Sequence, residues 1–137
     1  MAEGYIDPSR ENFDVFKALP RDTPLHMLNL IKFRELAEYP EGHPNHGKGL
    51  TGCEAYAIYK DAFQALVKDS GAAMVWHAPM ECVVTGPQGE WDEAFVMGYP
   101  DAGAFFAMVK DEAYARDALP HRTAAVADSR LIRFRGT

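Results

Sequence analysis

The sequence predicts an α+β fold, in which one antiparallel sheet carries helices on a single face. Three observations support this prediction. Residues 24–33 form a short apolar run typical of a buried strand, residues 51–70 carry an apolar stripe behind a helix cap, and residues 91–100 are typical of the returning strand of a hairpin. A second helical region and a last strand follow the hairpin.

A short helix is expected ahead of the first strand. Asp7 is a candidate N-cap, Pro8 suits a first helical position, and Pro20 ends the run. Its apolar residues fall near helical spacing at Phe13, Phe16 and Leu19. The helix is therefore expected to pack on the main body of the protein.

The first strand and the first long helix have the clearest patterns. In PLHMLNLIKF, alternation places four side chains on one face of the strand, namely Met27, Asn29, Ile31 and Phe33. A long loop rich in Gly, Pro and His follows. Thr51 and Glu54 then form a capping box at the start of a helix that Gly71 is expected to stop.

The second half of the chain predicts a hairpin, two helical stretches and a strand. AAMVWHA and MECVVTG, residues 72–86, are expected to form one long or broken strand interrupted at Pro79. WDEAFVMGYP is the returning strand. Asp101 and Asp111 are candidate caps of the two helical stretches, the second of which continues through Pro120, and SRLIRFR closes the chain as a strand.

These elements follow the order βαββαβ after a short extra helix. This is the ferredoxin-like pattern, an antiparallel sheet with helices on one side. We expect a single domain over residues 1–137, with an N-terminal helical extension at 1–20 and the βαββαβ unit at 25–134.

Composition excludes several classes of function. The net charge of −6 argues against a nucleic-acid partner, which needs a concentrated basic face. Charges or prolines interrupt every apolar run, so no membrane partner is expected. Two cysteines are too few for a disulfide framework, and the N-terminus does not resemble a signal peptide. We therefore expect a cytoplasmic protein.

Three stretches resemble a known family. HMLNLIKFRE, WDEAFVMGYPDAGAFFAMVKDEAY and HRTAAVADSRLIRF are similar to the domain-of-unknown-function family "thirteen-thirty", of the dimeric α+β barrel superfamily. The resemblance covers roughly Leu25 to Phe134. The residues that carry it are Asn29, Tyr99, Pro100, Asp111, Tyr114 and Arg122.

This resemblance implies a homodimer, in which the uncovered faces of two four-stranded sheets pack into a barrel. An apolar patch on a one-sided sheet leads to the same expectation, because monomers rarely leave such a patch in water. The residues expected in that patch are Met27, Ile31, Trp76 and Phe95. Related barrels include cofactor-free monooxygenases, lactone isomerases and haem enzymes, so the fold alone does not supply the function.

The stretch HGKGLTG contains a literal G-x-G-x-x-G. A dinucleotide-binding loop needs a strand that ends at the glycines, and the strand here ends well upstream, near Phe33. The favoured interpretation is a flexible segment that leads to the Thr51 cap, and the alternative is an anion-binding site at the helix N-terminus.

His43 and His46 in the same loop could hold a metal ion. The favoured interpretation is a solvated loop, which could act as a lid, so no metal site is expected.

Three polar residues are the candidate catalytic groups. Asn29 needs a hydrogen-bond partner if it is buried, so a structural role and a ligand-orienting role both stay open. Arg122 could bind a carboxylate, although a salt bridge to Asp128 or another nearby acid is favoured. His121 could transfer a proton near neutral pH.

Aromatic side chains could enclose a flat ligand, although such residues more often belong to the core. The expected ligand-binding set is Asn29, Tyr59, Trp76, Phe95 and Arg122. The favoured function is a homodimer that binds a small molecule. The alternative is a cofactor-independent monooxygenase or isomerase acting on a small aromatic or lactone. No cofactor is expected, because no histidine is well placed as a haem ligand.

Overall fold

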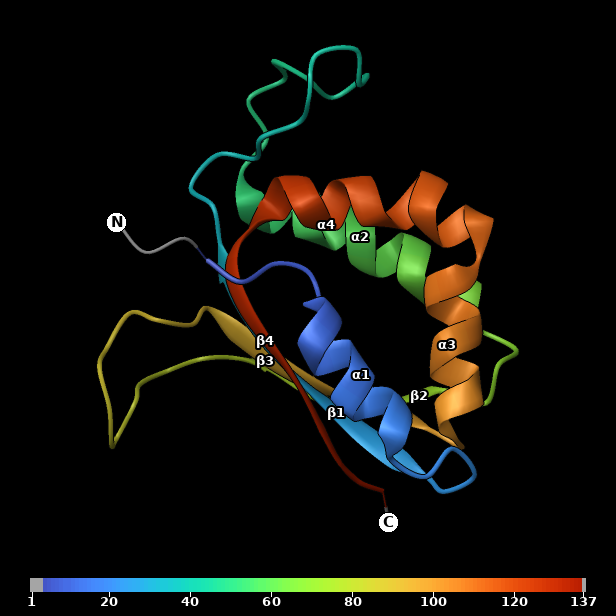
Figure 1. The fold of residues 1–137 in the computed structure, drawn as a ribbon. Coiled ribbons are helices and arrows are strands. Elements are labelled where there is room, and N and C mark those ends of the chain that lie inside the picture. The colour runs from blue at the N-terminus through green and yellow to red at the C-terminus, as the bar shows by residue number, and fades with distance from the viewer. Residues whose placement is uncertain (1–3, 137) are drawn as a thin grey trace.

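The computed structural model describes residues 4–136 and contains a four-stranded antiparallel sheet with the order β2-β3-β1-β4. The central strands are β1 (Leu25–Phe33) and β3 (Glu93–Tyr99), and the outer strands are β2 (Ala73–Pro79) and β4 (Val126–Arg135). The helices lie on one side of the sheet (Figure 1). The predicted α+β, ferredoxin-like fold is therefore confirmed.

Three helical segments cover the sheet in addition to the N-terminal helix. They are α2 (Gly52–Val67), α3 (Ala102–Lys110) and a joined pair made of the π-helical turn η1 (Tyr114–Ala118) and α4 (Leu119–Ala125). The predicted capping box between Thr51 and Glu54 is present. The Asp101 side chain accepts a hydrogen bond from the Ala104 backbone N–H at 2.9 Å, as predicted for the cap of α3.

The N-terminal helix α1 (Arg10–Ala18) is present, but its predicted cap was wrong. Ser9, not Asp7, is the N-cap, and its hydroxyl accepts a hydrogen bond from the backbone N–H of Asn12. Asp7 lies instead 3.9 Å from the Arg122 guanidinium. The helix packs on α3, with Phe13 stacked on Phe106 at a centroid distance of 5.7 Å.

The second strand is shorter than the sequence predicts. It ends at Pro79, and residues 80–92 form an irregular segment instead of the expected continuation through MECVVTG. Pro79 has no backbone N–H to donate to the neighbouring strand, so the regular pairing ends there. After it, the N–H of Met80 donates to the carbonyl of Asp92 at 3.0 Å. Beyond it, the Gln88 side chain bonds the backbone of Val83 and closes a local turn.

The two faces of the sheet carry different residues from those predicted. Met27, Ile31 and Phe95 lie on the helix-covered face, where each is at most 5% exposed. Only Trp76 of the predicted patch faces the uncovered side, where it pairs with Val96. A bulge between Met74 and Trp76 explains why Trp76 does not share the face of the other three, because one extra residue in β2 reverses the face of every side chain that follows.

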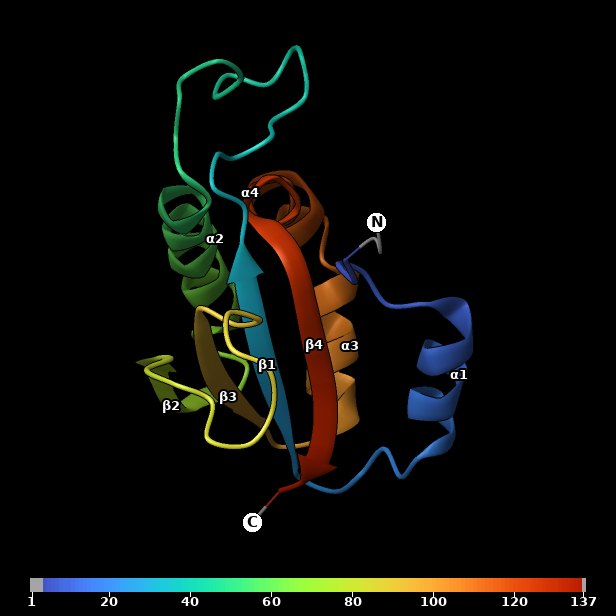
Figure 2. The ribbon, with the colours of Figure 1, turned by 90° about the vertical axis from the view of Figure 1, so that its left-hand side faces the viewer.

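The uncovered side, here called the open face, is nevertheless apolar. Its exposed large hydrophobic residues are Val75, Trp76, Ile132 and Phe134, next to the half-buried Leu28 and Leu30. Figure 2 views the sheet from this side, with β1 and β4 in front of α3. An apolar sheet face therefore exists as predicted, although its members differ.

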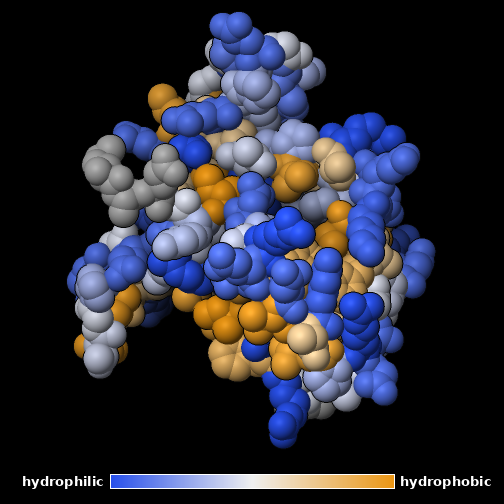
Figure 3. Space-filling model, viewed as in Figure 1, coloured by the Kyte–Doolittle hydropathy of each residue, from blue (hydrophilic) through white to orange (hydrophobic). Residues whose placement is uncertain are grey.

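A long loop joins β1 to α2 and projects beyond the ends of α2 and α4 (Figures 1 and 2). The space-filling view shows that its projecting end is mostly hydrophilic (Figure 3). Leu36 and Thr51 form an isolated bridge at its base.

Within residues 4–136, no helix is long and apolar enough to cross a membrane.

Candidate functional site

A cavity of about 970 Å³ lies between α1, α3 and the helix-covered face of the sheet. Apolar and aromatic side chains form most of its wall, from the strands and from the helices above them. They include Met27, Phe63, Phe95, Met97, Tyr99 and Phe105. A volume of this size is at the upper end of the range that binds drug-sized molecules.

Asn29 is the polar residue of β1 that lines this cavity. Its carboxamide nitrogen donates a hydrogen bond to the backbone carbonyl of Met27 at 3.1 Å. This bond fixes the orientation of the side chain and leaves the carboxamide oxygen without a hydrogen bond from the described residues. The structural role and the ligand-orienting role are therefore compatible in one side chain.

Arg122 also lines the cavity, but much of its guanidinium group is engaged. It donates hydrogen bonds to the backbone carbonyl of Ile6 and, at 3.3 Å, to the Ser129 hydroxyl. Its acidic neighbour is Asp7, at 3.9 Å. The salt bridge with Asp128 does not form, because Asp128 pairs with Arg130 at 2.8 Å.

Two tyrosines meet at the base of the cavity. The hydroxyl groups of Tyr59 and Tyr114 lie 3.4 Å apart, and both side chains are buried. Burial, followed by the proximity of Tyr114, raises the pKa of Tyr59 well above its ordinary value. Burial likewise raises the pKa of Tyr99. The phenols of Tyr59 and Tyr99 therefore stay protonated at neutral pH and can act as hydrogen-bond donors.

Four of the five predicted ligand-binding residues line the cavity, namely Asn29, Tyr59, Phe95 and Arg122. Trp76 does not, because the bulge in β2 places it on the open face, where it is 47% exposed.

His121 also lies outside the cavity lining. Its Nδ1 atom is hydrogen bonded to the Tyr39 hydroxyl at 2.6 Å. Burial, with a further contribution from His43, lowers the pKa of His121, so the neutral ring is favoured. His121 therefore does not share the cavity with Asn29 and Arg122.

The histidines of the long loop stabilise the loop itself. The backbone N–H of Asn45 donates a hydrogen bond to His43, and the His46 ring is hydrogen bonded to the Tyr39 carbonyl at 2.8 Å. The His43 ring also stacks on Tyr39 at 4.6 Å. Among residues 4–136 there is no group of three or more metal-binding side chains. Figure 1 shows the loop projecting beyond the ends of α2 and α4, and none of residues 34–51 lines the cavity, so the loop does not cover it as a lid.

The glycines of HGKGLTG have structural roles. Gly47 and Gly49 adopt positive φ angles of 76° and 73°, which favour glycine. Gly52 begins α2 so close to the preceding segment that a Cβ atom would lie 2.1 Å from the carbonyl oxygen of Arg34. The last glycine of the motif is thus explained by backbone packing.

A buried charge cluster lies between α2 and the sheet, beside β2. Glu93 is 5% exposed, forms an ion pair with Lys60 at 3.1 Å and is hydrogen bonded to His77. Because these partners satisfy the buried carboxylate, the cluster is a structural feature of the α2–sheet interface.

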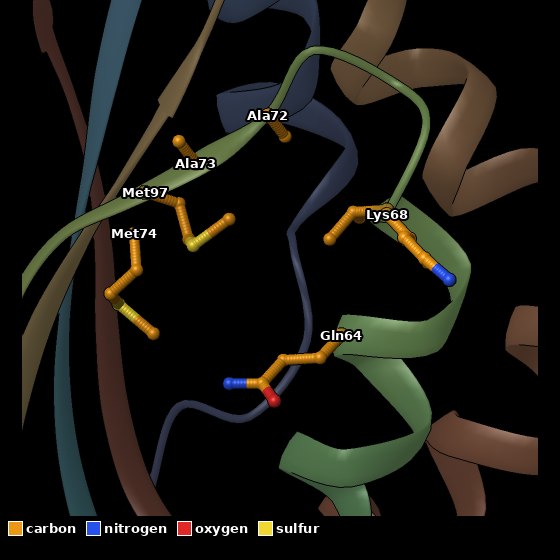
Figure 4. A pocket seen from close by; sticks show the side chains of 7 residues that line it. Gln64, Lys68, Ala72, Ala73, Met74 and Met97 are labelled. Atoms are coloured by element: carbon orange, nitrogen blue, oxygen red, sulfur yellow. The ribbon is translucent and has the colours of Figure 1, made fainter.

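A second, smaller pocket of about 210 Å³ lies between the end of α2 and β2. Met74, Met97 and Gln64 extend into this space (Figure 4). Its volume is below the usual range of small-molecule sites, so the larger cavity is the stronger candidate.

Sequence reasoning missed the contribution of the N-terminal segment. Residues from Tyr5 to Lys17 line one side of the cavity, including Phe13 and Phe16. Their near-helical spacing signalled a packed helix. It gave no sign that α1 would enclose a cavity with α3, about ninety residues away along the chain.

Comparison with solved structures places the chain beside two crystal structures of one bacterial protein. The methylated RPA0582 protein is 42% identical, with a TM-score of 0.88, over 99% of this chain and 97% of the other. The second, of RPA0582 from Rhodopseudomonas palustris, a protein of unknown function, is 41% identical with a TM-score of 0.86 over 98% of each chain.

A more distant structure is a dimeric protein of unknown function with a ferredoxin-like fold from Bacteroides fragilis NCTC 9343. It is 11% identical, with a TM-score of 0.50, over 82% of this chain and 96% of the other. At this identity the similarity concerns the fold alone. No family model matches the chain, and no curated protein matches it.

Proposed function

The chain belongs to the family of RPA0582, the Rhodopseudomonas palustris protein of unknown function, and we propose that it binds a small, largely apolar molecule in the cavity beneath α1. The observation that carries this proposal is the cavity itself, with a volume of about 970 Å³ and a mostly apolar wall. Small-molecule sites combine such a wall with a few polar groups that orient the ligand.

In this proposal, three of the lining residues contact the ligand and a fourth, Arg122, holds part of the cavity wall in place. The Asn29 carboxamide oxygen accepts a hydrogen bond, and the Tyr59 hydroxyl donates one. Phe95 packs against the body of the ligand. Arg122 positions the N-terminal segment that encloses it, because its guanidinium group donates to the Ile6 carbonyl.

We propose further that the protein is a homodimer formed through the open face. The exposed apolar side chains there include Trp76, Ile132 and Phe134, and such a surface is rarely left in water. The segment 80–92 projects on the same side of the sheet and carries Val84, which is 93% exposed. A second copy related by twofold symmetry would cover both features at once.

We also propose a family and a cellular location, both of which the sequence predicts. One is membership of the "thirteen-thirty" family, which rests on the order and spacing of residues such as Asn29 and Arg122. The other is a cytoplasmic location, in keeping with the two free cysteines, Cys53 and Cys82.

A cofactor-independent oxygenase or isomerase is the less supported proposal. Such chemistry needs a group that moves a proton at the substrate. His121 was the candidate for that role, and its ring is bound to Tyr39 outside the cavity. Among the described lining residues there is no histidine, and burial keeps the Tyr59 phenol protonated.

The cavity is tested with N-phenyl-1-naphthylamine, an uncharged aromatic probe that fluoresces when it leaves water. We expect saturable binding to the wild type and about tenfold weaker binding to Leu119→Trp, because the larger side chain occupies the cavity. Leu36→Trp is the matched control, since Leu36 is exposed in the long loop. No binding, or equal loss in both variants, would contradict the proposed site.

A further inference from the structure

The charges around the cavity are opposite in sign to the charge of the whole protein. The chain has 14 basic and 20 acidic residues and a net charge of −6. The cavity lining contains five of the basic residues, namely Lys17, Lys110, Arg122, Arg130 and Arg133. It contains one acidic residue, Asp7. The field in the cavity therefore favours an anion.

Two of these cations are already compensated. Arg130 forms an ion pair with Asp128 at 2.8 Å. Arg122 lies 3.9 Å from Asp7, and its hydrogen bonds go to the Ile6 carbonyl and the Ser129 hydroxyl. Little of either guanidinium group is left to attract a ligand.

The other three cations, Lys17, Lys110 and Arg133, form no ion pair with any acidic residue in the described range 4–136. The Arg133 Nη2 atom donates a hydrogen bond to the Pro20 carbonyl at 2.7 Å, whereas its Nη1 atom is buried and has no hydrogen-bond partner among the described residues. A buried donor without an acceptor is uncommon in folded proteins.

These three cations surround one aromatic cluster between α1, α3 and β4. The Lys17 amine lies 5.1 Å from the Phe13 ring centre, and the Lys110 amine lies 5.7 Å from that of Phe106. The two rings are stacked on each other. The Arg133 guanidinium lies 5.0 Å from the ring of Phe16, which contacts Phe106 edge-on at 5.3 Å.

We propose that the ligand of this cavity is an organic acid, with an apolar body among the aromatic walls and its anionic group beside one of the uncompensated cations that flank the aromatic cluster. Lys17 and Arg133 lie towards the end of α1, and Lys110 lies towards the end of α3. This inference rests on the proposed function and names its ligand class. An anionic group beside any of these cations would compensate a charge that no protein carboxylate neutralises, in a setting where aromatic walls limit screening by water.

The test uses two probes with the same aromatic body. N-phenyl-1-naphthylamine is uncharged, and 8-anilinonaphthalene-1-sulfonate carries one sulfonate. In the wild type we expect the affinity for the sulfonate probe to fall as salt is raised from about 0.05 to 0.5 M, and the affinity for the uncharged probe to stay nearly constant.

The decisive variant is Lys17→Gln/Lys110→Gln. It should weaken the sulfonate probe about tenfold, the size of one well-placed charge contact, and change the uncharged probe less than about twofold. The control Lys48→Gln/Lys68→Gln makes the same change in net charge at residues outside the cavity and should leave both affinities unchanged. Circular dichroism melting verifies that both variants are folded.

The outcomes separate the two proposals. Equal weakening of the sulfonate probe by both double variants, or no weakening by either, would overturn the anionic ligand while the uncharged probe still supports the cavity. If neither probe binds the wild type, the proposed function fails, and the anionic ligand with it.

Discussion

At Arg122, one guanidinium group ties together segments that are far apart along the chain. It donates to the Ile6 carbonyl before α1 and to the Ser129 hydroxyl in β4, and that hydroxyl in turn donates to the Tyr5 carbonyl at 2.6 Å. The backbone N–H of Tyr5 donates to Asp128 at 2.8 Å. These bonds hold the N-terminal segment against the cavity.

At Gly52, close packing predicts a large effect of a single methyl group. Gly52→Ala should destabilise the protein by about 3 kcal/mol or more, because the new Cβ atom would lie 2.1 Å from the Arg34 carbonyl oxygen and the backbone must move. Gly49→Ala should cost only about 1 kcal/mol of backbone strain, since its φ is 73° and no atom is close. Urea unfolding of the two variants compares these costs, and similar values would contradict the packing role of Gly52.

At His121, the lowered pKa predicts a dependence of stability on pH. The pKa in the folded protein lies below the ordinary value of 6.5, so the unfolded chain binds the proton more readily. The stabilisation is therefore fully present above pH 6.5 and is lost as pH falls through the folded pKa. The loss of stability from pH 7.5 to pH 5 should be smaller in His121→Gln than in the wild type. Urea unfolding at several pH values measures this loss of stability, and an equal loss in the wild type and in His121→Gln would contradict the lowered pKa of His121.

At the scale of elements, the parts that the sequence predicts well are those with local signals. Strand β1 and helices α2 and α3 were predictable because alternation, the Thr51–Glu54 box and the Asp101 cap lie within the elements themselves. The face that the helices cover was not predicted. Met27, Ile31 and Phe95 lie on the covered face, and Trp76 lies on the opposite face because of a bulge that arises in pairing with β3. The cavity depends on the contact of α1 with α3, which no local pattern encodes.

Helix α1 is expected to open more easily than the sheet, since none of its residues is fully buried. Phe16→Ala should increase hydrogen exchange of the α1 amides about tenfold, because it removes ring contacts with Phe105 and Phe106. Val15→Ala is the control, since Val15 is 66% exposed. Exchange in β1 should stay unchanged in both variants. Faster exchange across the whole sheet in Phe16→Ala would show that α1 unfolds only with the rest of the protein.

At the scale of the whole molecule, the two sides of the sheet have different roles in our proposals. The covered side holds the cavity, whose wall is completed by α1, and the open face is left for a second copy. A ligand could therefore bind each protomer without touching the interface. This division predicts that the binding of N-phenyl-1-naphthylamine per protomer is independent of the oligomeric state.

The homodimer predicts that one charge on the open face separates the protomers. Phe134→Glu places a carboxylate among apolar side chains, and burying it against a second copy would cost several kcal/mol. We expect sedimentation velocity at micromolar concentration to give a dimer for the wild type and a monomer for this variant. Leu36→Glu is the matched control, because Leu36 is also a large, exposed apolar residue but lies in the projecting loop. A monomeric wild type, or a variant that stays dimeric, would mean that the open face is not the interface, whereas the cavity behind the sheet would be unaffected by either result.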